Sequence, residues 1–283
     1  MATIVSAYYR LPKSKHSYES YKQWVTTFLK YVEGPLVFFT TEEEEAWIQE
    51  ARGDLPLCVV PMPFEKFPFQ TPDWMEFWTR TMEEQDEFKH LHSPEQFVIW
   101  NSKTWMVLNA MALNPFQTDK FVWCDAGCWR DERIAKAVGP QWPNPETLCD
   151  EMLFLDIRTI EWQREAVRAG TPWIQIDTRN AKENCIGGTI FAGGKKAWQT
   201  WAAAYYNTLE EYKARGWFAG DDQSVMMSTD LRLQVSEKTP PRHILAPQRD
   251  GYYNGMGDRW FAFQIFFGLN TPVNSPEECT LSS

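Results

Sequence analysis

Short apolar runs alternate with segments of helical periodicity over most of this chain. Residues 4–8, 36–39, 57–60 and 121–124 have the length and composition of buried strands. The segments between them are long enough for crossover helices, and in residues 21–32 the apolar side chains recur at helical spacing. The alternation predicts an α/β fold with a mostly parallel sheet and helices on both faces. In such sheets, ligands bind at the carboxyl ends of the strands.

The same patterns predict further elements in the second half of the chain. Strands are expected at residues 173–176, 186–191 and 243–245, and helices at residues 74–88, 95–113, 198–212, 221–231 and 260–267. A long irregular stretch is expected after residue 125, because it contains Pro140, Pro143 and Pro145.

The size and charge of the chain limit its domain count and its partners. With 283 residues, 43% of them hydrophobic, the chain can bury one large core, and we expect a single domain over residues 1–283. The formal net charge of −10 disfavours nucleic acid as a partner, and no basic stripe is visible in the sequence. An anionic ligand would therefore need a cation.

The sequence contains no stretch of about 20 apolar residues of the kind that spans a membrane, and its start lacks the profile of a signal peptide. We therefore expect a soluble, cytoplasmic protein. Its six cysteines are scattered and are expected to be reduced thiols: Cys58, Cys124, Cys128, Cys149, Cys185 and Cys279. Cys124 and Cys128 have no second Cys/His pair at zinc-ligand spacing.

The strongest candidate for chemistry is Asp125, which follows the apolar run of residues 121–124 directly. A carboxylate at the end of such a strand can hold Mg²⁺ or Mn²⁺, while a diphosphate takes other positions on the metal. Gly127 would allow the main chain to approach that ligand. The alternative is that Asp125 caps a turn and Gly127 only supplies an unusual backbone conformation.

Lys103 belongs to the helical segment before that strand. If this helix packs on the sheet, the ammonium group can point toward a diphosphate and offset its charge. A solvated surface lysine is the alternative.

Two later segments are further candidates. Residues 187–194 place glycines on both sides of a predicted strand, which permits either contact between ligand and main chain or tight packing. Asp221 and Asp222 stand together at the expected start of a helix, where one could be a cap and the other a catalytic base. His243, at a predicted strand end, is either a metal ligand or a structural histidine.

Taken in order, four segments resemble the HtrL/YibB family of glycosyltransferase-like proteins. The segments lie within residues 3–9, 20–40, 101–127 and 188–223. The order is also similar to the GT-A glycosyltransferase core, which implies a GT-A-type, Rossmann-like sheet.

The resemblance implies roles for individual residues. Asp222 falls where inverting enzymes keep their catalytic base, with Asp221 beside it, and Asp125 falls on the first position of the DxD metal motif. His243 falls where a late metal-binding histidine is expected. The positions expected to bind the nucleotide sugar are Ala7, Tyr8, Arg10, Thr40, Asn101, Lys103, Asp125, Ala126, Gly127 and Gly188.

The implied reaction transfers a sugar from a UDP-sugar, such as UDP-xylose or UDP-galactose, to a hydroxyl of a glycan, with Mn²⁺ or Mg²⁺ assisting. Gly127 replaces the second Asp of DxD, so the site offers one fewer anionic ligand. The alternative is a catalytically inactive protein of the same fold that binds carbohydrate. A metal-dependent phosphohydrolase is a weaker alternative, because no aspartate lies two residues after Asp125.

Overall fold

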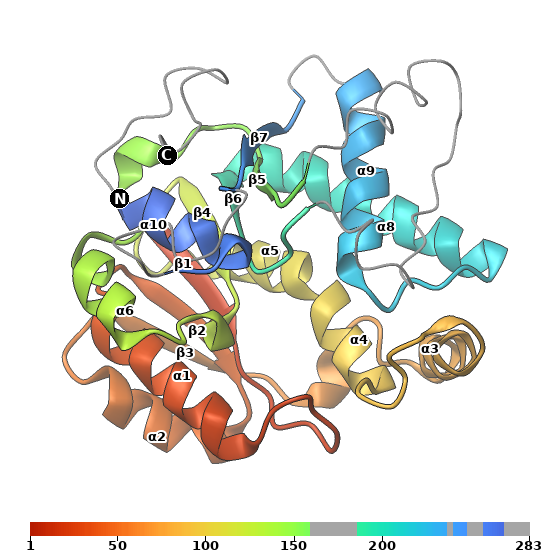
Figure 1. The fold of residues 1–283 in the computed structure, drawn as a ribbon, viewed down its shortest axis with the longest axis horizontal. Coiled ribbons are helices and arrows are strands. Elements are labelled where there is room, and N and C mark those ends of the chain that lie inside the picture. The colour runs from red at the N-terminus through yellow and green to blue at the C-terminus, as the bar shows by residue number, and fades with distance from the viewer. Residues whose placement is uncertain (159–185, 237–239, 248–256, 269–283) are drawn as a thin grey trace.

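A seven-stranded sheet forms the centre of the computed structural model, which describes residues 1–158, 186–236, 240–247 and 257–268 (Figure 1). Its order is β3-β2-β1-β4-β6-β5-β7. The strands are β1 (Ala2–Ala7), β2 (Leu36–Thr40), β3 (Leu57–Pro61), β4 (Lys120–Cys124), β5 (Leu153–Asp156), β6 (Ile190–Gly194) and β7 (Arg242–Leu245).

The pairing is parallel except around β6, which runs antiparallel to both β4 and β5. The predicted α/β class with a mostly parallel sheet is therefore confirmed. From β1 the chain first builds outward to β2 and β3 and then returns to place β4 on the other side of β1. This change of direction creates a topological switch point between β1 and β4, which is where such sheets bind ligands.

Helices cover both faces of the sheet, and each face has its own apolar core. One face packs against α3 (Pro72–Gln85), α4 (Pro94–Asn101), α5 (Lys103–Leu113), α8 (Lys195–Arg215) and α9 (Asp222–Ser236). The other packs against α1 (Tyr18–Tyr31), α2 (Glu42–Arg52), α6 (Glu132–Val138) and α10 (Ala262–Gly268). The alternation of side chains along β1 explains the division, because Val5 faces the first core and Ile4 the second.

Some predicted elements differ from those observed. The helix expected at residues 95–113 is two helices, and Lys103 is the first residue of the second. The expected irregular stretch contains β5, which the sequence analysis did not identify, and β6 begins later than the strand expected at 186–191. The strand expected at 173–176 lies outside the described residues.

The buried side chain of Arg52 joins the end of α2 to two neighbouring turns. Its guanidinium donates hydrogen bonds to four main-chain carbonyl groups, which belong to Leu29, Val32, Gly34 and Pro56. Three of these carbonyls lie between the last turn of α1 and the start of β2. The fourth, that of Pro56, lies just before β3 and also accepts a hydrogen bond from the Leu36 N–H, so one side chain satisfies main-chain groups at the ends of three elements.

Candidate functional site

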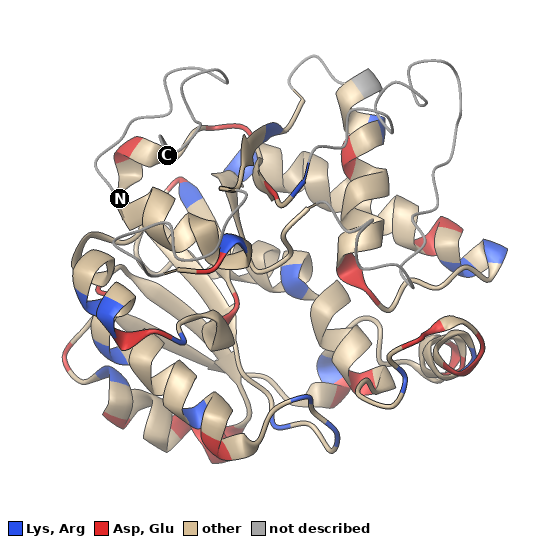
Figure 2. Cartoon of the chain, viewed as in Figure 1, with Lys and Arg blue, Asp and Glu red and all other residues tan. Residues whose placement is uncertain are grey.

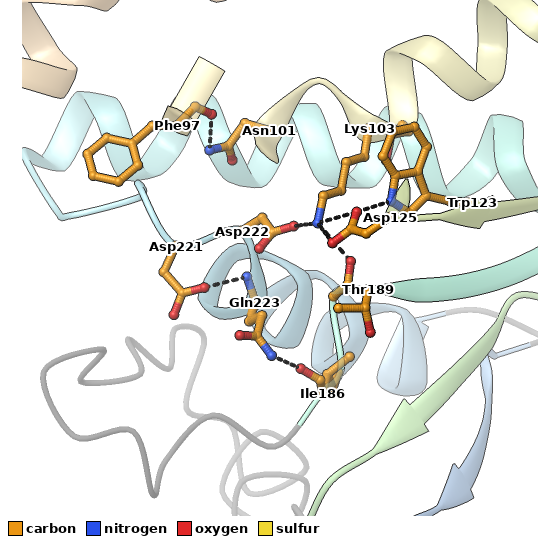
Figure 3. Close-up of polar contacts among 12 residues, drawn as sticks. Phe97, Asn101, Lys103, Trp123, Asp125, Ile186, Thr189, Asp221, Asp222 and Gln223 are labelled. Atoms are coloured by element: carbon orange, nitrogen blue, oxygen red, sulfur yellow. Dashed lines mark hydrogen bonds and ion pairs between the residues drawn. The ribbon is translucent and has the colours of Figure 1, made fainter. Parts of the chain in front are cut away.

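The ammonium group of Lys103 lies between two carboxylates that are far apart in the sequence (Figure 3). Its Nζ is 2.8 Å from Asp222 Oδ2 and 3.3 Å from each Asp125 oxygen. It also donates a hydrogen bond of 2.8 Å to the carbonyl oxygen of Gly188. An ammonium group has three donors, and these three partners account for them. We call Lys103, Asp125 and Asp222 the lysine cluster.

The local structure explains why Lys103 and Asp125 meet. Lys103 is the first residue of α5, which packs beside β1 and β4, and Asp125 is the residue after β4. The Trp123 indole donates to Asp125 Oδ1 at 2.7 Å and fixes the orientation of the carboxylate. The Lys103 side chain is only 6% exposed, while that of Asp125 is 29% exposed. Lys103 is thus not a solvated surface lysine.

The opposing effects of burial and charge set the pKa values in the lysine cluster. Burial by itself lowers the pKa of Lys103, but the negative charges of Asp125 and Asp222 outweigh it and the net pKa is raised. Burial raises the pKa of Asp125, and the charge of Asp222 adds to this, while Lys103 acts in the opposite direction. Lys103 is therefore held in its charged form.

Asp222 is held in place by the segment that begins α9. The Asp221 carboxylate accepts a hydrogen bond of 3.0 Å from the main-chain N–H of Gln223, and the Gln223 side chain donates to the carbonyl of Ile186. A Cβ atom at Gly188 would lie 3.2 Å from both Asp222 oxygens. Glycine at this position therefore allows the main chain to lie directly against the carboxylate.

A cavity of about 630 Å³ opens beside the lysine cluster at the carboxyl ends of β1 and β4. Its lining includes Ala7, Tyr8 and Arg10 after β1, Asp125, Ala126 and Gly127 after β4, and Lys103. The cavity therefore occupies the switch point of the sheet and has a volume typical of small-molecule sites.

Three residues expected at the nucleotide do not line this cavity: Thr40, Asn101 and Gly188, whose carbonyl accepts from Lys103 instead. Thr40 is buried, and its hydroxyl donates to the carbonyl of Tyr8 at 3.0 Å. Asn101 is also buried; its amide donates to the carbonyls of Phe97 and Ala219, and its oxygen accepts from the Tyr205 hydroxyl. The contacts of Thr40 and Asn101 fix the segments that lead to the site, so both residues support the cavity without lining it.

His243 occupies a separate buried position between two other carboxylates. Its Nδ1 is 2.7 Å from Asp156, and its Nε2 is 2.9 Å from Asp230. Burial opposes the charge on the imidazole, but both aspartates favour it, and the pKa of His243 is raised to about 10. A metal ligand needs a neutral imidazole with an available nitrogen. His243 is therefore not part of the candidate site.

The donor set of the lysine cluster does not fit a divalent cation. Asp125 Oδ1 accepts from Trp123, and Lys103 pairs with both carboxylates and occupies the space between them. The Cβ of a second aspartate at position 127 would lie 3.1 Å from the Tyr21 ring. Within the described residues, no group of three or more His, Cys, Asp or Glu side chains is arranged to hold a metal ion.

The cavity also has basic residues that the sequence analysis did not select. Lys15 and His16 come from the loop between β1 and α1, and Arg130 follows β4 by a few residues. Figure 2 shows lysine and arginine along that loop. Loops after parallel strands are where ligand-binding residues are expected, and this rule could have identified them.

Comparison with known proteins identifies a family for the central part of the chain. Residues 73–159 match the HtrL_YibB family model. The family is described as a bacterial protein of unknown function. The match confirms, for these residues, the resemblance drawn from the sequence, and it includes Lys103 and Asp125 but not Asp222. No curated protein shows a significant sequence match.

Solved structures of low sequence identity are similar in fold. Core-mannan synthase A from Aspergillus fumigatus, in an Mn/GDP form, is 12% identical with a TM-score of 0.43, over 86% of this chain and 72% of that one. A 4-diphosphocytidyl-2C-methyl-D-erythritol synthase from Anaerococcus prevotii is 11% identical with a TM-score of 0.35, over 94% of each chain. A CMP:2-keto-3-deoxy-manno-octonic acid synthetase complexed with CTP is 13% identical with a TM-score of 0.37, over 87% of this chain and 90% of that one.

The helices in the described parts of the chain include none that combines the length and the apolar character needed to cross a membrane.

Proposed function

We propose that this chain is a glycosyltransferase that moves a sugar from a nucleotide sugar, such as a UDP-sugar, to a hydroxyl group of a glycan. The observation that carries the proposal is the position of the lysine cluster beside the cavity at the switch point. Lys103 and Asp125 line that cavity, and Asp222 contacts Lys103 from a separate segment. A buried cation between two carboxylates, next to a cavity of ligand size, is typical of a catalytic centre.

In this proposal the two substrates bind on different sides of Lys103. The nucleotide sugar occupies the cavity on the Asp125 side, with its diphosphate near the ammonium group. The acceptor hydroxyl approaches from the side of Asp222 and Asp221, which lie across Lys103 from Asp125 in Figure 3. The amide of Gln223 holds this region of α9 to the chain before β6.

The reaction then proceeds by displacement at the anomeric carbon. The bond from this carbon to the diphosphate oxygen breaks, a bond to the acceptor oxygen forms, and Asp222 takes the acceptor proton. Attack from the face opposite the diphosphate inverts the anomeric centre. Lys103 stabilises the charge that develops on the leaving group, and this contribution exceeds that of the base. Because the donor set does not fit a divalent cation, the metal-assisted form of the reaction is not part of these steps.

The test is an assay of nucleotide-sugar turnover with a panel of donors and glycan acceptors. Asp222→Asn keeps the size of the side chain and removes the base, so we expect nucleotide binding to persist and transfer to fall about 10²–10⁴-fold. Asp150→Asn is the matched control, because the Asp150 side chain is 92% exposed.

Two outcomes would contradict the proposal. Unchanged transfer in Asp222→Asn would remove this residue from the reaction. Binding of glycans without binding of any nucleotide or nucleotide sugar would replace the enzyme with the carbohydrate-binding alternative.

A further inference from the structure

The wall of the cavity is basic, although the protein as a whole is acidic. Among the described residues that line it, the lysines and arginines are Arg10, Lys15, Lys103 and Arg130, whereas the only carboxylate is Asp125. The chain has a formal net charge of −10, so the positive charge of the cavity lining contrasts with the acidic composition of the whole chain. A cavity that focuses positive potential in this way favours an anionic ligand.

Arg130 is oriented by two aromatic rings and one main-chain carbonyl. Its guanidinium carbon lies 4.4 Å from the centre of the Trp24 ring and 5.1 Å from that of Phe261, and its Nε donates to the carbonyl of Gly127 at 3.2 Å. The two terminal nitrogens make no hydrogen bond to the residues that the structure describes. A planar guanidinium held by rings on its faces presents these donors as a fork, which matches two phosphate oxygens.

Lys15 and His16 extend the same basic surface. The His16 ring packs edge-on against Trp24, with a distance of 4.9 Å between ring centres, so it shares a ring partner with Arg130. Burial lowers the pKa of His16, and the charges of Arg130 and Lys15 lower it further. These groups therefore lie close enough to repel one another, and a bound anion would relieve the repulsion.

The lysine cluster cannot bind a diphosphate alone. Lys103 is paired with two carboxylates, so the lysine cluster carries a formal charge of about −1 and cannot by itself balance the charge of a diphosphate. The cluster also does not fit a metal ion, as described above. The further positive charge for a diphosphate must then come from the other basic residues that line the cavity.

We infer that Arg130, together with Lys15, binds the diphosphate of the nucleotide sugar and does so without a divalent metal ion. This inference rests on the proposed function for the identity of the ligand. The guanidinium fork donates hydrogen bonds to two phosphate oxygens, and the Lys15 ammonium offsets the remaining charge. Trp24 and Phe261 are positioning residues, because they act by orienting Arg130.

The test uses isothermal titration calorimetry with two probes, inorganic pyrophosphate and UDP, in the presence of EDTA. We expect both to bind the intact protein, and we expect Arg130→Ala and Lys15→Ala each to weaken binding by about tenfold or more. Arg130→Lys should retain only part of the affinity, since it keeps the charge but loses the fork. Arg133→Ala is the matched control, because Arg133 is an exposed arginine nearby that pairs with Asp131.

A second measurement follows His16 by NMR. Pyrophosphate should raise the pKa of His16 in the intact protein, because it places negative charge beside Lys15 and Arg130. At a pyrophosphate concentration that half-saturates the intact protein, the rise in this pKa should be much smaller in Arg130→Ala.

Binding of pyrophosphate only when Mn²⁺ is added, or equal binding by Arg130→Ala and Arg133→Ala, would overturn the inference. Metal-dependent turnover of a nucleotide sugar that is unaffected by Arg130→Ala would also overturn it while supporting the proposed function. Arg130-dependent pyrophosphate binding in a protein that turns over no nucleotide sugar would overturn the proposed function and support the anion site.

Discussion

Replacing Lys103 with methionine should destabilise the protein far more than the loss of an ordinary lysine. Methionine keeps most of the length of the side chain but leaves Asp125 and Asp222 facing each other without a cation. The ion pair at 2.8 Å corresponds to an attraction of about 6 kcal/mol at an effective dielectric constant of about 20, and the pair at 3.3 Å to about 5 kcal/mol.

Only part of this attraction appears as stability. Removing the Lys103 ammonium from water costs several kcal/mol, and water screens Asp125, whose side chain is 29% exposed. Breaking a buried pair by deleting one partner usually costs about 3–5 kcal/mol, and we expect Lys103→Met to fall in this range.

Urea denaturation at pH 7 measures the change in the free energy of unfolding. Lys136→Met is the control, because Lys136 forms an ion pair of 2.9 Å with Glu132 but its side chain is 57% exposed. Exposed pairs of this spacing contribute about 0.3–0.5 kcal/mol. Adding Asp222→Asn to Lys103→Met should recover part of the lost stability, since it removes one of the two opposed charges.

Equal effects of Lys103→Met and Lys136→Met would refute this reasoning. They would mean that Lys103 is solvated and that the two carboxylates do not depend on it. A double variant less stable than Lys103→Met alone would likewise contradict the assigned repulsion.

Two more predictions concern buried charges away from the cavity. Because the pKa of His243 is raised to about 10 from an ordinary value near 6.5, the stability gained from its contacts with Asp156 and Asp230 is complete below about pH 6.5 and is lost as the pH rises toward 10. Urea denaturation at pH 6 and pH 9 should show this loss of stability. His243→Gln should remove this pH dependence and cost about 3–5 kcal/mol at pH 6. An NMR titration in which His243 titrates near pH 6.5 would contradict the prediction. Arg52→Met should cost about 3 kcal/mol, because it removes the side-chain donor from four main-chain carbonyls, of which that of Pro56 keeps a hydrogen bond from Leu36. The same substitution at the exposed Arg80 should change stability by less than about 0.5 kcal/mol.

Local patterns were sufficient to predict the α/β class and the position of Asp125. An apolar strand followed directly by a carboxylate places that carboxylate at the ligand-binding edge of a parallel sheet, whatever the order of the strands. The resemblance to the GT-A core implied that Lys103 and Asp222 belong to one site, and the structure brings the two side chains into contact. Their roles in catalysis and the single-domain organisation remain predictions.

Features that depend on tertiary contacts could not be predicted from local sequence patterns. The antiparallel direction of β6 follows from how it fits between β4 and β5, and no local pattern encodes it. The basic wall of the cavity combines residues 10, 15, 103 and 130, so it leaves no charged run in the sequence. His243 has the residue type of a metal ligand, and only the positions of its two carboxylate neighbours show that both nitrogens are engaged.

The contacts of Lys103 also constrain the order in which the segments of the chain can fold around it. Asp125 lies 22 positions away, whereas the Gly188 carbonyl lies 85 positions away, and the second carboxylate comes later still. A nascent chain that has emerged only to β5 therefore lacks both the Gly188 carbonyl and Asp222, and Asp125 is the only carboxylate of the lysine cluster that it contains. The lysine cluster is complete only after the segment that begins α9 has docked.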